Sequence, residues 1–437
     1  MRPPCARREL GSEQWGQQQG ARRDQEYRSL QSPAHGHGSL CVAPAQAPEI
    51  NMPLSTNTRS VASRFPRNGR RRWTVARGEG RKSGQPRARK ECAMTDSLLW
   101  EDVNEGDELP VLEYPITVKN LVMGVVGTRD FMPYHHDSAY TQSIGSRDQF
   151  VNTMFNQALF GRFVTDWCGP DADFRATTLN MIGQVCPGDT AILEGRVASK
   201  RREGDDYLVE LELNSRNHLG SACISTATMA LPSREGGGVK PRLELAKPQI
   251  ELDPGFPDFA REWLGKESEP RYGAYPVSEV QIMYWADMVE DSNPLYEDTE
   301  YARDSRHAGI IAPPMALITW TMDRPGRSGV NPEAPDVGQP ERGPWPPRSG
   351  PPTAAARFDP PGATATVATI SEQAYGKPLR PGDRVSASTE LVNCSGLKQT
   401  RLGPGYFTTV LNNYYNQDGE LVGTNLFTLL RYTAQEG

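Results

Sequence analysis

Residues 150–167 read FVNTMFNQALFGRFVTDW, and this stretch decides how the surrounding chain can fold. Large apolar side chains recur in it at spacings of three and four residues, which is the period of one buried helix face. These positions are Phe150, Val151, Met154, Phe155, Leu159, Phe163 and Trp167. The spacing predicts a long core helix over about residues 148–167.

Four runs typical of β-strands follow the predicted helix, at residues 176–185, 191–200, 207–215 and 222–231. In the third run three apolar residues alternate with two glutamates, which predicts that one face of this strand is buried and the other is exposed to solvent. The alternating residues are Val209, Glu210, Leu211, Glu212 and Leu213. One long helix followed by antiparallel strands indicates an α+β unit in which a curled sheet surrounds the helix.

The same order of elements recurs in the second half of the chain. We expect a helix at 277–290, a shorter one after Pro313 and Pro314, and strands near 364–371, 384–392, 405–415 and 421–432. A Pro-Gly-Asp turn precedes a strand in each half, at 187–189 and at 381–383. Residues 325–361 contain 11 Pro in 37 positions, which excludes a helix or strand and indicates an exposed insertion.

The charge is divided unevenly along the 437 residues. Residues 1–93 hold 18 Lys and Arg against 7 Asp and Glu, whereas residues 94–437 hold 30 against 47. The first segment has no apolar period, so we expect it to be disordered or an over-called N-terminal extension, with Met94 as the candidate initiator. The acidic remainder argues against nucleic acid as a partner, and the lack of a stretch of about 20 apolar residues argues against a membrane span.

The seven Cys are odd in number and scattered, with no C-x-x-C spacing. This pattern argues against a disulfide framework and against a thiolate zinc site, and it favours a reducing, cytoplasmic location.

The densest polar cluster is RDFMPYHHD at residues 129–137. Pro133 is expected to break the preceding helix, leaving a bend from which Asp130 and His135 can converge. A carboxylate and an imidazole that share one water can hydrate a double bond, because one takes a proton from the water and the other returns a proton to carbon. The alternative is a solvated surface loop. Tyr134 and His136 flank the pair and either line the site or pack the loop.

A metal site is a further alternative. His135 and Asp137, with His218 as a third ligand, would form a facial triad for non-haem iron. His218 follows His135 by 83 residues, a spacing that arises by chance, so we predict no metal.

The motifs DFMPYHHD (130–137), FVTDW (163–167) and GQVCPGD (183–189) resemble a MaoC-like hydratase/dehydratase domain. DSNPLY (291–296) and IAPP (311–314) resemble its companion module, so the resemblance covers about residues 98–433. It implies two tandem hotdog modules that form a pseudo-dimer with sheets joined edge to edge. The expected divisions are a catalytic module at 94–233, a linker at 234–273 and a degenerate, substrate-binding module at 274–433.

The resemblance also implies roles. It places the catalytic pair on Asp130 and His135, whereas Tyr296 occupies the His position of the second module, and a phenol with a pKa near 10 is a poor base. The implied reaction is reversible hydration of a trans-2-enoyl-CoA to a 3-hydroxyacyl-CoA, of R configuration by analogy. A backbone N–H near Gln149–Asn152 would hold the thioester oxygen, and Gln149 and Asn152 are candidate substrate-binding residues. No cofactor is implied, because CoA is part of the substrate.

Three departures resemble the steroid-side-chain subgroup of actinobacterial MaoC hydratases. Met132 stands where many hydratases have Asn, the active-looking half comes first, and GSRDQ (145–149) replaces a Gly-rich entrance to the core helix. The prolines that shorten the second helix predict an open cavity for a bulky, steroid-like acyl group. Expected partners are the acyl-CoA substrate and either a second copy or a partner subunit such as a thiolase or aldolase.

Two other functions stay open. A hotdog thioesterase would use a carboxylate on the core helix, where Asp148 and Asp166 lie near the predicted ends. A non-catalytic acyl-CoA-binding subunit would need no acid–base pair.

Overall fold

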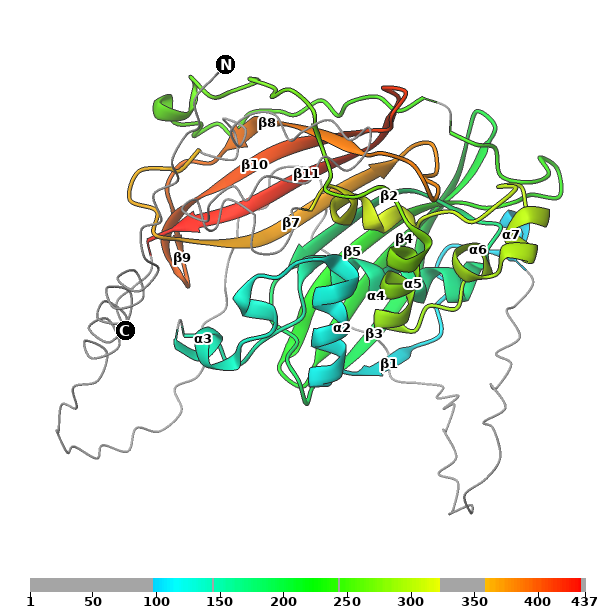
Figure 1. Cartoon of the computed structure of the whole chain (residues 1–437), viewed down its shortest axis with the longest axis horizontal. Helices are drawn as coiled ribbons and strands as arrows, with labels where there is room; N and C mark the ends of the chain where they lie inside the picture. Colours follow the sequence, from blue (N-terminus) through cyan, green and yellow to red (C-terminus); the bar gives the residue numbers. More distant parts are fainter. Residues whose placement is uncertain (1–96, 144, 243, 323–357, 434–437) are drawn as a thin grey trace, which may run out of the picture. The chain divides into compact units, whose positions relative to one another are not determined.

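The computed structural model describes residues 97–143, 145–242, 244–322 and 358–433 (Figure 1). Residues 1–93 and most of the predicted insertion at 325–361 lie outside the described residues. In the first half the helices are η1 (Trp100–Asp102), α2 (Val118–Thr128), η2 (Pro133–His135), α3 (Ser138–Ser143) and α4 (Thr153–Cys168). Its strands are β1 (Leu112–Pro115), β2 (Asp173–Met181), β3 (Thr190–Glu203), β4 (Asp206–Asn217) and β5 (Gly220–Ala230).

The second half repeats this order. Its helices are α5 (Glu279–Val289), α6 (Pro294–Glu297), α7 (Thr299–Asp304) and η4 (Pro314–Thr321), and η3 (Asp258–Ala260) lies in the connection. Its strands are β6 (Arg271–Tyr272), β7 (Ala365–Tyr375), β8 (Ser386–Cys394), β9 (Lys398–Thr400), β10 (Gly403–Tyr415) and β11 (Leu421–Tyr432). The predicted α+β class and the tandem hotdog arrangement are confirmed.

Within the residues that the structure describes, the two halves share one antiparallel sheet of eleven strands. Its order is β1-β3-β4-β5-β2-β7-β11-β10-β8-β6, with β9 paired to β10. Strands β2 and β7 join the halves, with Thr177 opposite Gln373 and Leu179 opposite Ser371. The predicted edge-to-edge pairing is therefore present, and it removes two edges that would otherwise be exposed.

The backbone hydrogen bonds repeat from one half to the other, which identifies equivalent positions. In each half, a backbone N–H that follows the DFMPYHHD or DSNPLY motif donates to a backbone carbonyl within that motif. A second backbone N–H, just before the first long helix of the half, donates to the backbone carbonyl of the aspartate in the Pro-Gly-Asp turn. These bonds run from Phe150 to Tyr134 and from Ile116 to Asp189, and in the second half from Ile311 to Leu295 and from Val277 to Asp383. Because Tyr134 precedes His135 and Leu295 precedes Tyr296, the structure places Tyr296 at the position of His135.

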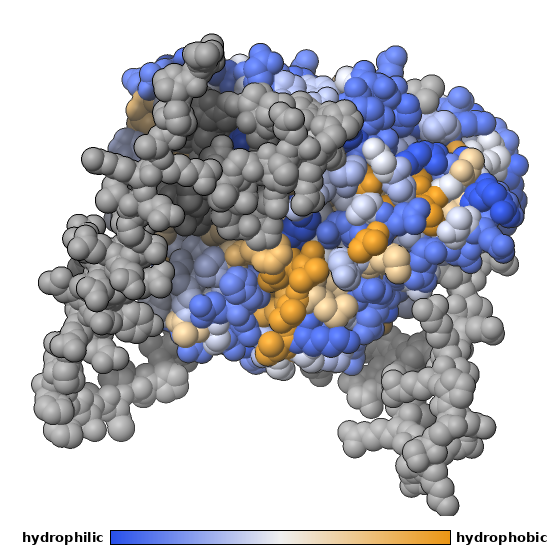
Figure 2. All heavy atoms as spheres, in the orientation of Figure 1, coloured by the Kyte–Doolittle hydropathy of each residue, from blue (hydrophilic) through white to orange (hydrophobic). Residues whose placement is uncertain are grey.

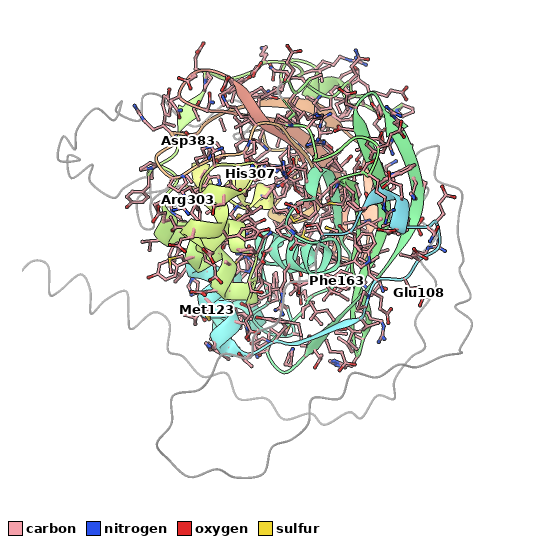
Figure 3. All side chains as sticks on the ribbon, turned by 90° about the vertical axis from the view of Figure 1, so that its right-hand side faces the viewer. Glu108, Met123, Phe163, Arg303, His307 and Asp383 are labelled. Carbon is pink, nitrogen blue, oxygen red and sulfur yellow. The ribbon has the colours of Figure 1, made fainter. Side chains whose placement is uncertain are left out.

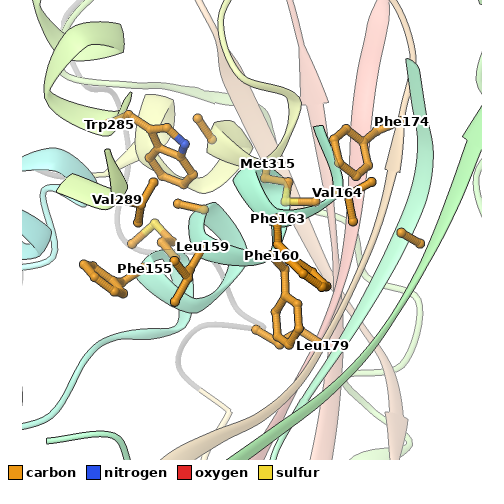
Figure 4. Packing of buried hydrophobic residues seen from close by; sticks show 14 of the residues in the cluster. Phe155, Leu159, Phe160, Phe163, Val164, Phe174, Leu179, Trp285, Val289 and Met315 are labelled. Carbon is orange, nitrogen blue, oxygen red and sulfur yellow. The ribbon is translucent and has the colours of Figure 1, made fainter. Parts of the chain in front are cut away.

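Helix α4 carries the core of the first half. It begins at Thr153 rather than near residue 148, because the Asn152 side chain caps it by accepting from the Phe155 N–H at 2.7 Å. Figure 4 shows its aromatic and aliphatic side chains packed between the sheet and the helices of the second half. Phe155, Phe160 and Phe163 are at most 3% exposed, and burial of each such side chain contributes about 1.5–3 kcal/mol. In Figure 3, Phe163 lies in the interior, whereas Glu108 and Arg303 lie toward opposite rims.

The matching helix of the second half is shorter, as the sequence predicted, but it is a 3-10 helix of eight residues. Pro314 occupies the first position of η4, where its missing N–H is tolerated, but Pro313 and Pro314 would break a helix that began earlier in the chain. The 3-10 helix η4 packs against α4 and the sheet: Met315 approaches Gly161, and Leu317 fills the space over Gly423.

The connection between the halves packs on the second half. Phe256, Ala260 and Phe358 form a small separate core with Leu391 and Cys394. Phe358, from the predicted insertion, therefore packs against this connection.

The face formed by α2 and α5 exposes many apolar side chains. Figure 2 shows apolar residues gathered over α2 in this view. The exposed residues on the two helices are Val118, Val122, Val126, Val280, Met283 and Tyr284, each at least 38% accessible. Among the described residues, no helix is both long and apolar enough to cross a membrane.

Candidate active site

Asp130 lies directly after the end of α2. The chain turns there because Arg129 adopts a left-handed conformation with φ of 61°. The Asp130 carboxylate accepts the N–H of Met132 at 3.3 Å, and the Asp130 N–H donates to the Thr128 hydroxyl at 3.3 Å. Pro133 then starts the short helix η2, which ends at His135. The helix end, the turn and Pro133 together fix the carboxylate relative to the imidazole.

His135 is held in one tautomer. Its Nδ1 lies 2.8 Å from the carbonyl oxygen of Phe150. A carbonyl only accepts, so Nδ1 carries the proton and Nε2 keeps a lone pair in the neutral ring. Nε2 lies 3.5 Å from Oδ2 of Asp130. Burial lowers the pKa of His135, while the charge of Asp130 acts in the opposite direction, so the ring is neutral near pH 7.

The Asp130 carboxylate and Nε2 of His135 each offer a hydrogen-bond acceptor to the same point in space. A neutral Nε2 and a carboxylate oxygen 3.5 Å apart can each accept one hydrogen of a single water. A water held in this way directs its oxygen lone pairs away from both groups, toward an electrophilic carbon. This geometry suits general acid–base chemistry at neutral pH.

Asn152 connects the start of α4 to the turn that holds Asp130. Its Nδ2 donates to the Thr128 hydroxyl at 2.6 Å while its Oδ1 caps the helix. The side chain is 3% exposed and both polar ends are engaged, so it positions the site. Thr128 is fully buried; its hydroxyl also donates to the Gly124 carbonyl at 2.6 Å.

Some of the backbone N–H groups at the start of α4 already donate hydrogen bonds within the protein. The N–H groups of Gln149, Phe150 and Val151 donate to Asp148, Tyr134 and Val185 respectively. Within the described residues, those of Asn152, Thr153 and Met154 have no hydrogen-bond partner, as expected for the first turn of a helix. Any donor to a substrate oxygen is therefore expected within 152–154, which begins at the last residue of the predicted range 149–152 and extends two residues beyond it.

The other predicted residues lie at different distances from the pair. Tyr134 is half-buried and contacts both His135 and Phe150 through its ring. His136 is exposed, and its Nε2 bonds the Phe131 carbonyl oxygen at 3.1 Å. Gln149 is buried three residues before the cap of α4, and no hydrogen bond of its side chain is present in the part of the chain that the structure describes.

Both halves border this site. Burial, followed by the neighbouring phenols of Tyr140 and Tyr432, raises the pKa of Tyr134. Tyr432 ends β11, so the second half approaches the loop of the first half that holds Asp130 and His135. A narrow recess with almost no enclosed volume lies beside His135, and it is lined by Leu121, Gly124, Val125, Phe150, Val151, Asn152 and Phe155.

The equivalent position of the second half is closed. Asp291 keeps the local turn, since its carboxylate accepts the N–H of Asn293 at 3.0 Å. Burial raises the pKa of Asp291 to about 7 and raises the pKa of Tyr296 well above its usual value. Cys168, at the end of α4, lies near Tyr296 and is itself fully buried.

The rival site residues make other contacts. Asp148 accepts from Ser138 and from the Gln149 N–H, and Asp166 pairs with Arg162 at 3.2 Å. Asp137 caps α3 through the Tyr140 N–H, and His218 is largely exposed beside Asp189. Across the described residues, no three His, Cys, Asp or Glu side chains come together as metal ligands.

Sequence reasoning missed Thr128, Phe150 as the partner of His135, and Tyr432. Thr128 could have been suspected from its position one helical turn after Gly124, where Thr bonds a carbonyl four residues back. Tyr432 gave no signal, because only the pairing of the sheet brings it to the loop.

Comparisons with known proteins place this geometry in context. A family model described as "FAS1-like, dehydratase domain region" matches residues 262–340. Over 171 residues the chain is 37% identical to a Thermomonospora curvata protein described as "Probable enoyl-CoA hydratase alpha subunit", covering 39% of this chain and 50% of that one. Over 126 residues it is 33% identical to the Mycobacterium tuberculosis 3-oxo-4,17-pregnadiene-20-carboxyl-CoA hydratase beta subunit, covering 29% of this chain and 95% of that one.

The alpha subunit of that same Mycobacterium tuberculosis hydratase is 38% identical over 140 residues, covering 32% of this chain and 40% of the subunit. The chain therefore spans half or less of the length of the two alpha subunits. Among solved structures, a MaoC-domain protein of Chloroflexus aurantiacus matches 78% of this chain and 98% of its own, with a TM-score of 0.52 at 13% identity. A Mycobacterium tuberculosis protein with a double hotdog fold matches 77% and 99%, with a TM-score of 0.50 at 10% identity. These two likenesses concern the fold.

Proposed function

Because the chain belongs to the family of MaoC-like hydratases and dehydratases, we propose that it is an enoyl-CoA hydratase that adds water reversibly to a trans-2-enoyl-CoA. One observation carries this proposal: the Phe150 carbonyl fixes the proton on Nδ1 of His135, which leaves Nε2 as an acceptor 3.5 Å from the Asp130 carboxylate. The product is the 3-hydroxyacyl-CoA, of R configuration by family analogy.

The proposed reaction proceeds on a water held between Asp130 and His135. One of the two takes a proton as the water oxygen bonds to C3, and the electrons of the C2–C3 double bond move toward the thioester carbonyl. C2 then receives a proton from the protonated member of the pair, so that one water is added in total. Dehydration follows the same steps in reverse.

The thioester oxygen gains negative charge as C3 is attacked. A free N–H in the first turn of α4 would donate to it, and the positive end of the helix dipole would add to the effect. The substrate's CoA is part of the reacting molecule, and no further cofactor enters these steps.

The acyl group is proposed to be bulky. The curated relatives include a hydratase named for a pregnadiene-carboxyl-CoA, and in the described part of the second half the helix at the place of α4 is the short η4. We expect kcat/KM for a ring-bearing enoyl-CoA to exceed that for crotonyl-CoA by about tenfold, or roughly 1.4 kcal/mol. A preference for the four-carbon substrate would contradict this part of the proposal.

We also propose that one chain does what two named subunits do in its relatives. The Mycobacterium tuberculosis hydratase has an alpha and a beta subunit, whereas here both modules lie in one polypeptide.

The apolar face of α2 and α5 continues directly from the contact between the halves, where Gln281 of α5 donates to the carbonyl of Gly127 at 2.7 Å. Such a face favours association, so we expect a second copy to cover it. A dimer mass by light scattering that Val122→Glu converts to a monomer mass would support this; a monomer, or a dimer unchanged by the substitution, would refute it.

The proposed activity is tested with the purified full chain and a trans-2-enoyl-CoA. We expect enone absorbance to fall without release of thiol, and Asp130→Asn or His135→Gln to reduce the rate by at least about a hundredfold. His136→Gln, one residue away and exposed, is the matched control and should retain activity. Thiol release would point to a thioesterase, and full activity in the Asp130 or His135 variants would refute the assignment.

A further inference from the structure

One straight row of residues crosses eight strands on the face of the sheet that meets the helices. Each residue of the row lies directly opposite the next one in the strand pairing, and the row changes from apolar to polar where the two halves join. In the first half it is apolar, with Val197 on β3, Leu211 on β4 and Ala227 on β5. From the junction onward it is polar, with Thr177 on β2, Gln373 on β7, Asn425 on β11, Asn412 on β10 and Thr389 on β8.

Contacts with α4 fix which face this row occupies. Gln157, on α4, donates to the Ser371 hydroxyl at 3.0 Å, and that hydroxyl donates to Oδ1 of Asn425 at 2.9 Å. Farther out, the Thr389 hydroxyl donates to Asn412 at 2.8 Å. The polar part of the row therefore faces the molecular interior, where a hotdog sheet ordinarily packs apolar side chains against its helix.

Two polar atoms beside this row have no partner among the described residues. They are Oε1 of Gln157 and Nε2 of Gln373, and both side chains are at least 97% buried. The other end of the Gln373 amide accepts from Tyr375 at 2.8 Å. Whichever way each amide is turned, one of its polar atoms lacks a hydrogen bond. Buried groups left in this state are rare in native proteins and indicate a missing water or ligand.

The buried end of the row lies close to the turn that holds Asp130, because the cap of α4, Asn152, bonds Thr128 in that turn. Gln157 follows the cap residue Asn152 by five positions, which is about 8 Å along the helix axis. The 3-10 helix η4 covers Gly423, two residues before Asn425, through Leu317. Beyond this contact Asn412 and Thr389 stay half-exposed.

We propose that this row recognises an oxygen substituent on the acyl group, remote from the thioester. The ligand class is a ring-bearing enoyl-CoA with a hydroxyl or keto group on the ring; a keto oxygen would accept from Gln373, and a hydroxyl could also donate to Gln157. This inference rests on the proposed hydratase function and specifies its substrate. A wholly hydrocarbon acyl group would leave both amides unpaired, so the site selects against it.

The test compares two substrates with one carbon skeleton: (E)-3-(4-oxocyclohexyl)acryloyl-CoA and (E)-3-cyclohexylacryloyl-CoA, together with the corresponding bicyclic pair. We expect the parent chain to favour the oxygenated member in kcat/KM by about fivefold or more. Gln373→Met and Gln157→Met keep the side-chain length but remove the hydrogen bonds, and either should bring this ratio close to one. The matched control is Thr178→Val, on the opposite face of β2, where the hydroxyl bonds Thr226.

The outcomes separate the inference from the function on which it depends. Equal efficiency for both members of each pair, unchanged in the Met variants, would show that the row holds only buried water and would overturn the inference alone. Failure to hydrate any enoyl-CoA would overturn the proposed function, and the inference with it. The two Met variants lie on different elements, so misfolding of one leaves the other as a test.

Discussion

The two halves carry an aspartate at equivalent positions, and only one of them is expected to work in catalysis. Asp130 and Asp291 each accept a backbone N–H two residues ahead, from Met132 and Asn293. Asp130 faces His135, whereas Asp291 is 8% exposed near Tyr296. The substitutions Asp130→Asn and Asp291→Asn keep the acceptor of each turn and remove only the ionisable group.

The expected effect on stability follows from the pKa of Asp291, which burial raises from 3.8 to about 7. The folded state then holds a proton that the unfolded state releases, so ionisation costs stability as pH rises from about 4 to 7. A shift of about three units corresponds to roughly 4 kcal/mol as an upper bound. The amide N–H₂ that the substitution Asp291→Asn introduces needs a buried partner, which reduces the gain. We therefore expect Asp291→Asn to stabilise the chain by about 1–3 kcal/mol at pH 8 and by little at pH 4.

Urea unfolding at the two pH values measures this difference, and hydration of an enoyl-CoA measures activity. Asp291→Asn should stay active, whereas Asp130→Asn should lose at least about a hundredfold in kcat/KM with little change in stability. A loss of activity in Asp291→Asn as large as that in Asp130→Asn would refute the assignment of catalysis to the first half. A lower stability of Asp291→Asn at pH 8 would refute the argument from burial.

Three more outcomes follow from the site and the junction. Thr128→Val removes a hydroxyl that bonds Gly124, Asn152 and Asp130, so kcat should fall about tenfold with little change in KM, and Thr128→Ser should restore it. Because burial lowers the pKa of His135, kcat/KM should hold constant down to about pH 6.5 and fall only below it, and a loss that begins above pH 7 would contradict the neutral ring. Gly127→Ala places a Cβ 2.8 Å from the Tyr284 carbonyl oxygen and should lower the free energy of unfolding by about 1–3 kcal/mol in a urea titration, whereas Val126→Ala on the exposed face should not.

The core of the fold could be predicted because its signals are local. The period of apolar residues in 150–167 and the alternation in 207–215 each report one buried face, and both correspond to observed elements, α4 and β4. The helix start was wrong by about five residues, because Asn152 rather than Asp148 supplies the cap. The Asp130 and His135 pairing was predicted, and it depends on a break at Pro133 that the sequence displays.

The remaining features arise from contacts between distant segments. The Phe150 carbonyl that fixes the His135 tautomer is set by where α4 begins, and the approach of Tyr432 is set by the pairing of β2 with β7. The polar row is visible only once the register of eight strands is known, since its members, from Thr177 to Asn425, lie up to about 250 residues apart. No periodicity within a single segment carries this information.

The asymmetry of the two modules is itself informative. In a symmetric dimer of identical hotdogs, each helix would have to fill its own sheet and serve its own site with the same residues. A single chain removes this constraint: α4 has sixteen residues, whereas η4, at the matching place of the second half, has eight. The end of α4 carries the buried Cys168 close to the buried Tyr296 of the second half, while Gln157, one turn into the same helix, bonds Ser371 next to the polar row. One helix thus holds the turn of Asp130 at its start, through Asn152, and contacts the polar part of the shared sheet along its side, through Gln157.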